Sequence, residues 1–70
     1  MKTNVSIKFN SIEEYREIEK KLEELGYVVV KEKDSVSGYV YVNNKVKMFL
    51  KITEFSYGDV YNSLEEFLKD

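Results

Sequence analysis

The spacing of apolar residues changes twice along the first half of the chain. Apolar and polar residues alternate in 5-VSIKF-9, which is the period of a strand with one buried face. From Ile12 to Leu25 apolar residues recur at steps of three and four, the spacing of a single stripe along a helix. The segment 27-YVVVKEK-33 is again typical of a strand and is apolar on both faces at its start. This half therefore predicts a strand, a helix and a second strand.

The expected helix has a start signal and a stop signal. Ser11 lies just before the apolar stripe and Glu14 follows three residues later, which is the pattern of a capping box. In this motif each side chain satisfies a backbone N–H group that the first helical turn leaves unpaired. Gly26 comes directly after the stripe, and glycine adopts the left-handed backbone conformation that ends a helix without strain.

The second half of the chain predicts a β-hairpin. After the loop 34-DSVSG-38, the segments 39-YVYV-42 and 46-VKMFLKIT-53 have the pattern of two strands on either side of Asn43 and Asn44. Asn tolerates the positive φ angles that a tight hairpin turn requires. The turn contains either these two asparagines alone or three residues that include Lys45.

The hexapeptide 10-NSIEEY-15 returns almost unchanged as 62-NSLEEF-67. If the second copy acts like the first, Ser63 caps a helix of only about one and a half turns, which is too short to be stable by itself. A longer helix over residues 57–68, capped by Ser56, also fits, because apolar residues keep helical spacing throughout it. We favour the longer helix and interpret the echo as two amphipathic helical segments rather than a duplicated functional motif.

These elements predict an α+β fold in which two helices lie on one face of a four-stranded sheet, in the order β-α-β-β-β-α. Seventy residues without Pro or a low-complexity tract indicate a single small α+β domain over residues 1–70. The first strand is expected to lie parallel beside either the second or the fourth strand, and the right-handed crossover rule permits both.

The length of the hairpin turn decides which side chains share a face of the sheet, because directly opposed residues point to the same side. A two-residue turn places Tyr39 and Tyr41 on the face of the most apolar row, which we expect to be the core row: Val46, Met48, Leu50 and Ile52. The other face then carries Val40, Val42 and Phe49 among Lys45, Lys47 and Lys51. A three-residue turn puts Tyr39 and Tyr41 on that lysine face in place of the valines.

Two helices cover only one side of such a sheet, so the second face is expected to be open, half apolar and rimmed by lysine. An apolar patch of more than a few hundred Å² on a small protein commonly marks an interaction site. The charges are distributed in the same way. Residues 11–26 and 56–70 together carry a net charge of −6 and the remaining residues carry +4, within a total of −2. The sequence therefore predicts acidic helices behind a basic sheet.

The composition narrows the possible chemistry. The chain has no Cys and no His, and so lacks the commonest nucleophiles, bases and zinc ligands. It has only three Gly and no glycine-rich phosphate loop. We therefore expect no enzymatic activity, no cofactor, no metal and no small-molecule substrate. Because 1-MKTNVSIKFN-10 has no secretory signal and the longest apolar run is 27-YVVV-30, we expect a cytoplasmic protein without membrane contact.

These observations favour a non-enzymatic protein-interaction module of the inhibitor or adaptor type, and by analogy of size and surface a virus-encoded one. It is expected to bind a protein partner, to form a homodimer, or both, through the open sheet face or by strand addition at a sheet edge. The expected interface residues are Val40, Val42, Phe49, Lys47 and Lys51.

The alternative function is single-stranded nucleic-acid binding by a basic, aromatic sheet face. Aromatic side chains would stack on bases while lysines neutralise phosphates. The expected contacts are Lys8, Tyr39, Tyr41 and Lys45. The acidic net charge of the chain weighs against this function, as does the presence of Arg16 alone as Arg among the eleven basic residues.

Overall fold

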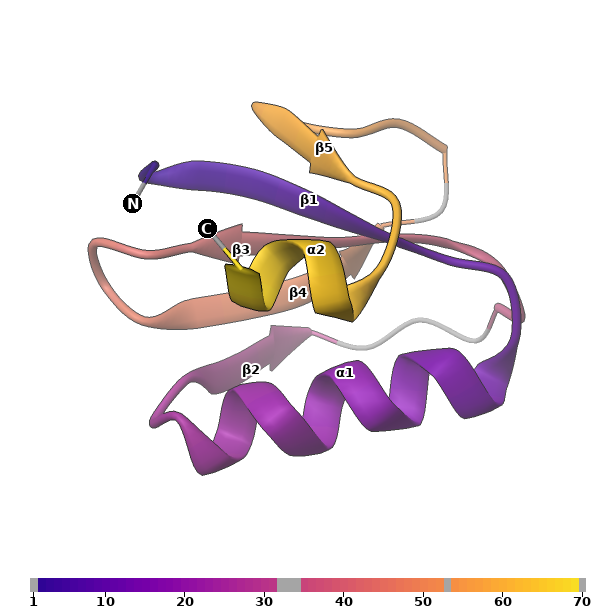
Figure 1. Cartoon of the computed structure of the whole chain (residues 1–70), viewed down its shortest axis with the longest axis horizontal. Helices are drawn as coiled ribbons and strands as arrows, with labels where there is room; N and C mark the ends of the chain where they lie inside the picture. The colour runs from indigo at the N-terminus through magenta and orange to yellow at the C-terminus, as the bar shows by residue number, and fades with distance from the viewer. Residues whose placement is uncertain (1, 32–34, 53, 70) are drawn as a thin grey trace.

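The computed structural model describes residues 2–31, 35–52 and 54–69, which form a mixed five-stranded sheet and two helices (Figure 1). The elements follow in the order β1 (Asn4–Phe9), α1 (Ile12–Glu24), β2 (Val28–Lys31), β3 (Gly38–Asn43), β4 (Met48–Ile52), β5 (Asp59–Tyr61) and α2 (Leu64–Lys69). The α+β class is confirmed. The expected count of four strands is wrong, because residues 59–61 form β5. The ends of two expected strands, residues 32–33 and 53, lie outside the described residues.

The strands lie in the order β2-β4-β3-β1-β5, as Figure 1 shows from bottom to top. β1 runs antiparallel to β3 and parallel to β5, whereas β2 runs parallel to β4. The expectation that the first strand lies beside the second or fourth strand is therefore wrong. Its apolar row pairs instead with β3, where Val5 faces Val42 and Ile7 faces Val40.

The turn between β3 and β4 contains four residues, 44–47, so both expected turn lengths are wrong. Asn43 holds the turn, because its side-chain oxygen accepts hydrogen bonds from the backbone N–H groups of Lys45 (2.9 Å) and Val46 (3.2 Å). Lys47 closes it with a φ of 60°. A four-residue turn keeps the parity of a two-residue turn, so Tyr41 faces Leu50 and the two-residue grouping of side chains into faces is confirmed.

Both helices contribute to one core on the same face of the sheet, as expected. Tyr15, Ile18 and Leu22 of α1 and Phe67 of α2 join a buried cluster with three residues of β1, two of β3 and one of β4: Val5, Ile7, Phe9, Val40, Val42 and Phe49. This face is the opposite of the one expected to be the core. The row formed by Met48, Leu50 and Ile52 points away from the helices, and Val46 lies exposed in the turn.

Two aromatic rings accommodate Lys51 on the helix face of the sheet. It belongs to the same row as Phe49, and its side chain is buried, with 3% of its surface exposed. Its Nζ atom lies 4.1 Å from the centre of the Tyr15 ring and 5.5 Å from that of the Phe9 ring. A cation over aromatic faces keeps favourable electrostatics in a desolvated position. A lysine in this row is therefore compatible with a place beneath α1.

The repeated hexapeptide forms two capping boxes. The N–H of Glu14 donates to Ser11 Oγ (3.1 Å), and Glu14 Oε1 accepts from the N–H of Asn10 (3.0 Å). In the second copy the N–H of Glu66 donates to Ser63 Oγ (3.2 Å), and Glu66 Oε1 accepts from the N–H of Asn62 (3.3 Å). The longer helix favoured from the sequence is therefore wrong. Ser63 starts a short helix in the way that Ser11 starts a long one.

The similarity of the two copies extends to the aromatic residues on either side. In 9-FNSIEEY-15 the rings of Phe9 and Tyr15 lie 5.4 Å apart, and in 61-YNSLEEF-67 those of Tyr61 and Phe67 lie 5.8 Å apart. The strands that lead into the two copies are parallel neighbours. A short helix becomes stable in this setting because Phe67 is buried in the common core.

Candidate functional site

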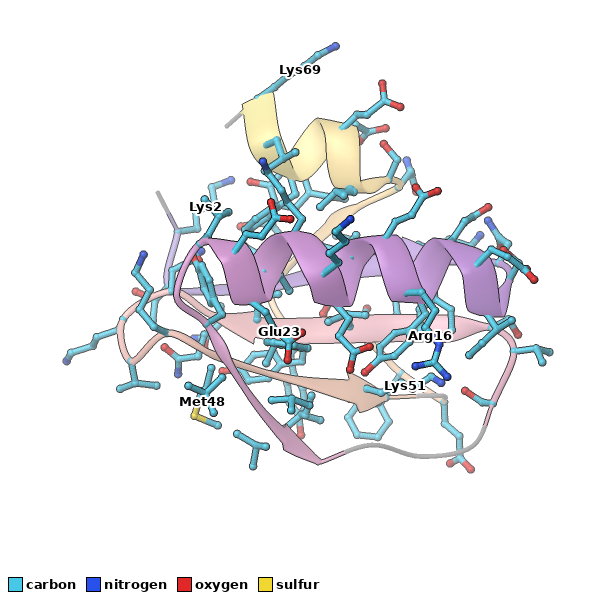
Figure 2. The ribbon with its side chains drawn as sticks, turned by 90° about the horizontal axis from the view of Figure 1, so that it is seen from below. Lys2, Arg16, Glu23, Met48, Lys51 and Lys69 are labelled. Carbon is cyan, nitrogen blue, oxygen red and sulfur yellow. The ribbon has the colours of Figure 1, made fainter. Side chains whose placement is uncertain are left out.

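The face of the sheet turned away from the helices carries the strongest candidate for a functional surface. We call it the open face, and in the described strands it includes Ser6, Lys8, Val28, Tyr39, Tyr41, Met48, Leu50, Ile52 and Val60. Figure 2 shows Met48 on the side of the sheet away from α1. Neither of the two described helices covers this face, and most of its central side chains are apolar or aromatic.

A loop of residues 54–58, here called the aromatic loop, crosses part of the open face between β4 and β5. Ser6 fixes it to β1, because the N–H of Tyr57 donates to Ser6 Oγ (2.9 Å) and Ser6 Oγ donates to the carbonyl oxygen of Tyr57 (2.8 Å). Ser6 is fully buried. A buried hydroxyl that both donates and accepts satisfies its hydrogen-bonding capacity while it holds the loop at one position.

Gly58 provides the second attachment of the aromatic loop. Its φ is +66°, and a Cβ atom built at this position would lie 2.0 Å from the carbonyl oxygen of Asn4. No side chain fits in that space, and an L-residue would also be strained at this backbone angle. Glycine thus allows the loop backbone to lie directly against the start of β1.

The aromatic side chains of this region form a chain of edge-to-face contacts. The ring of Tyr57 lies 5.6 Å from that of Tyr41 on β3 and 5.1 Å from that of Phe55. The hydroxyl of Tyr41 donates to Asn4 Oδ1 (2.5 Å) and accepts from Asn43 Nδ2 (3.3 Å). These contacts hold Tyr41 in place, whereas Phe55 and Tyr57 each keep about half of their surface exposed, at 50% and 53%.

A pocket of about 570 Å³ lies between the aromatic loop and the sheet. It is lined by Asn4, Tyr41, Leu50, Lys51, Ile52, Phe55, Tyr57 and Gly58. This volume is within the range of pockets that hold small ligands or protruding side chains. Most of the lining side chains are apolar or aromatic, and the Asn4–Tyr41 pair supplies a polar group at its margin. The pocket is therefore suited to an apolar group rather than to an ion.

Beside the pocket, the β2 edge of the open face is bare. Val28 is 65% exposed and Val30 is 55% exposed, and Val28 lies next to Met48 in the β2–β4 ladder. We call Val28, Val30 and Met48 the valine patch. Val30 lies where the register of the ladder shifts, at a bulge. The open face thus has a raised aromatic part and a lower aliphatic part.

The residues expected at an interface are not gathered on this surface. Val40, Val42 and Phe49 are fully buried under the helices, so the prediction that they form the open face is wrong. Lys51 is also buried, between the sheet and α1. Lys47 lies in the turn, with its Nζ atom 4.7 Å from the centre of the Tyr27 ring, and so does not border the pocket.

Three of the four residues expected to contact nucleic acid do share the open face. Lys8 lies directly opposite Tyr39 in the β1–β3 ladder, and Tyr41 is two residues further along β3. Lys45 is exposed in the turn between β3 and β4. Their contact with nucleic acid stays a prediction.

Sequence reasoning missed the residues that build the pocket, chiefly Ser6, Phe55, Tyr57 and Gly58. The signal was present in 55-FSYG-58, where two aromatic residues alternate with small ones and end in glycine. Such a segment is typical of an ordered loop or turn. The helical spacing from Tyr57 onward favours instead the start of the second helix, with Ser56 as its cap.

The other groups with distinctive chemistry lie away from the pocket. The hydroxyl of Tyr27 donates to Asn44 Oδ1, and desolvation by burial raises the pKa of Tyr27 above its ordinary value. Lys2 and Asp59 form an ion pair (3.2 Å). A second pocket, of about 320 Å³, lies between the first turns of the two helices. Over residues 2–31, 35–52 and 54–69, no group of three His, Cys, Asp or Glu side chains is arranged to hold a metal ion.

In comparisons with known proteins, no family model matches this chain, and no curated protein and no solved structure shows significant similarity to it. Within the described part of the chain, neither helix has the length and apolar character needed to cross a membrane.

Proposed function

We propose that this chain is a cytoplasmic, non-enzymatic protein-binding module of the inhibitor or adaptor type that acts through its open face. The observation that carries the proposal is the aromatic loop. Ser6 and Gly58 hold this loop over a sheet face that neither described helix covers, and Phe55 and Tyr57 remain half exposed. A rigid aromatic surface of this kind loses little side-chain entropy on binding.

The composition of the open face supports protein binding. Tyr is enriched among the residues that dominate binding energy at protein interfaces, and such residues act where a pocket excludes water. Here Tyr41 and Tyr57 flank a pocket next to the exposed valine patch. Single exposed apolar residues are normal on protein surfaces, but a cluster that joins a pocket marks an interaction site.

Site-specific photo-crosslinking tests the proposal. A photoreactive phenylalanine derivative replaces Phe55 in one form of the protein and the exposed Glu13 of α1 in another, and both are irradiated in cells of the native host. We expect a discrete protein adduct from position 55, identified by mass spectrometry, and none from position 13. Adducts from position 13 alone, or none from position 55, would refute binding through the open face.

Single-stranded nucleic-acid binding is a second candidate, and one observation favours it. Lys8 and Tyr39 lie opposite each other on the open face, so a phosphate and a stacked base could be held on adjacent strands. Fluorescence anisotropy with a labelled single-stranded oligonucleotide tests it. Binding that weakens steeply with salt and is lost in Lys8→Glu would support this function. Absence of binding at low salt would exclude it.

A further inference from the structure

We propose that the open face binds a second copy of this chain, so that the aromatic loop of each copy packs on the valine patch of the other. This inference rests on the proposed function, because it names the partner of the same surface. Four features support it, namely the charge distribution, the relief of the face, its size, and the limited core of a chain of seventy residues.

The charges favour contact between two open faces. The strand positions of this face carry two lysines, Lys8 on β1 and Lys31, which pairs with Leu50, and Glu54 of the aromatic loop adds one charge of the opposite sign. Two open faces can therefore meet without strong repulsion. The two segments that contain the helices carry a net charge of −6, and a face-to-face dimer keeps both helical layers on the outside. A highly charged partner would find little to complement on the open face.

The relief of the open face is self-complementary. The aromatic loop rises over β1 and β3, where Tyr57 is bonded to Ser6 and packs on Tyr41, while the valine patch lies low at the β2 edge. A two-fold axis parallel to the strands turns the raised side of one copy toward the low side of the other. Tyr57 is held by Ser6, which pairs with Tyr41 of β3. Tyr41 pairs with Leu50 of β4, and Leu50 lies beside the bulge of β2 that contains Val30. Tyr57 of one copy then meets the Val30 end of the valine patch of the other.

The size of the face suits a weak dimer. The molecule measures 27 × 20 × 18 Å, and Figure 1 views it along the shortest of these axes, across the sheet, with α1 beside β2 and outside the strands. The whole outline covers on the order of 500 Å² and the open face only part of it, so two copies bury at most about 1,000 Å² in total. That area lies at the lower limit of specific protein interfaces, which agrees with a dimer that depends on protein concentration.

A second copy also supplies burial that the single chain lacks. A chain of seventy residues without Cys or His has neither disulfides nor a zinc site to reinforce its core. In the dimer, the exposed Val30 of one copy would lie against the half-exposed rings of Phe55 and Tyr57 in the other. Oligomerisation is a common way for small domains to gain such contacts.

Light scattering on the protein as it elutes from a size-exclusion column, over a wide range of concentrations, measures its oligomeric state directly. We expect twice the 8.3 kDa of one chain at high concentration, and the same result in moderate salt, because the contact is largely apolar. A mass of one chain at every concentration would overturn the proposal.

A matched pair of valine variants locates the contact. Val28 and Val36 have similar exposed fractions, 65% and 69%, but Val28 lies in the valine patch and Val36 in the segment before β3. We expect Val28→Glu to be monomeric and Val36→Glu to remain dimeric, with unchanged circular dichroism in both. A dimeric Val28→Glu would place the contact elsewhere.

Disulfide trapping then distinguishes a face-to-face dimer from one that joins two β2 edges. The chain has no Cys, so each introduced cysteine is unique. We expect a mixture of the Val30→Cys and Tyr57→Cys proteins to form the mixed disulfide. The Val30→Cys protein alone should not cross-link, because the two β2 edges lie on opposite sides of the dimer. A Val30→Cys disulfide between two copies would indicate pairing of β2 edges and would contradict the proposed geometry.

The photo-crosslinking experiment separates failure of the dimer from failure of the proposed function. A monomer whose position 55 captures a different protein would overturn the dimer and leave the protein-binding function standing. A monomer that captures nothing would overturn both. A dimer whose adduct is a second copy of this chain supports both.

Discussion

Lys51 shows how a charged residue can be accommodated in the buried row of a sheet. Its ammonium group lies over the Tyr15 and Phe9 rings, with its stem in the same row as Phe49. Burial of a charge is unfavourable, and attraction to the electron-rich faces of two rings offsets part of that cost. For the stability of the fold, the sign of the charge at position 51 therefore matters more than whether a charge is present.

We predict that Lys51→Met changes the free energy of unfolding by no more than about 1 kcal/mol, because lost cation–π attraction and relieved desolvation nearly cancel. Lys51→Glu should destabilise the fold by about 3 kcal/mol or more, because it places an anion against the same ring faces. Urea unfolding followed by circular dichroism measures both values, with Lys45→Glu in the exposed turn as the control. Equal effects of Met and Glu at position 51 would contradict the role given to the rings.

Gly58 and Gly26 provide a second comparison at the level of single residues. Both have positive φ angles, +66° and +94°, but a Cβ atom at Gly26 would meet nothing within 4 Å, whereas one at Gly58 would collide with Asn4. Gly26→Ala therefore tests backbone strain alone. Gly58→Ala tests strain together with the close approach of the aromatic loop to β1.

We expect Gly26→Ala to cost about 1–2 kcal/mol of unfolding free energy and Gly58→Ala to cost clearly more. Gly58→Ala should also weaken the near-ultraviolet circular dichroism, because the loop that aligns Phe55, Tyr57 and Tyr41 would shift. Gly26→Ala should leave that signal unchanged. Equal losses of stability and signal in the two variants would argue against a tight attachment at Gly58.

At the scale of elements, the two strand-to-helix units show that one local signal can start helices of very different length. Each unit contains one copy of the hexapeptide, which begins with Asn-Ser and ends with an aromatic residue. That aromatic residue is buried in the common core, as Tyr15 in α1 and as Phe67 in α2. The capping box fixes where each helix begins, and tertiary contacts decide how far it continues.

We predict that Ser11→Ala and Ser63→Ala each lower the free energy of unfolding by about 1 kcal/mol, because each leaves a backbone N–H group without its partner. Asp at either position should restore most of the loss, since its carboxylate accepts the same hydrogen bond. Denaturant titrations of the four variants test this, with the exposed Ser37→Ala as the control. A Ser63→Ala variant as stable as the wild type would mean that Phe67 alone positions α2.

These elements also show what the sequence could predict. The first strand, the helix over residues 12–24 and its cap follow from strong local periodicity, and the structure contains all three. The sheet order depends on contacts between distant segments, such as β1 with β5, which local periodicity does not encode. The fifth strand has only three residues. The spacing of Tyr57, Val60 and Tyr61 is helical, so the sequence predicts a helix where this strand lies.

The candidate surface was predicted only in part for a related reason. The sequence left two groupings of the side chains open, and the structure has the grouping of the two-residue turn, because the four-residue turn has the same parity. The sequence did not predict which face packs on the helices. The row that contains Met48 is more apolar than the row that contains Lys51, so apolarity favours the wrong row as the core. The pocket depends on a loop that folds back over β1, and the hydrogen bonds between Ser6 and Tyr57 span a separation of 51 residues.

At the scale of the whole molecule, the fold separates an acidic helical layer from a nearly uncharged open face. The core cluster of the described residues lies between the sheet and the helices, while the aromatic rings of the loop and the two valines of the valine patch keep about half or more of their surface exposed. Their exposed apolar surface adds to the free energy of unfolding only when a second surface covers it. A dimer built on this face therefore couples association to stability.

We predict that the thermal midpoint rises with protein concentration, by about 5 °C for each tenfold increase if unfolding and dissociation occur together, as the entropy of unfolding of two such chains implies. Val28→Glu should remove this dependence and unfold at the midpoint of the separated chain, whereas Val36→Glu should behave like the wild type. Differential scanning calorimetry over a series of concentrations measures the slope. A wild-type midpoint that stays constant would mean that the open face adds nothing to stability through self-association. The aromatic loop would then have to be held in place for a different protein partner.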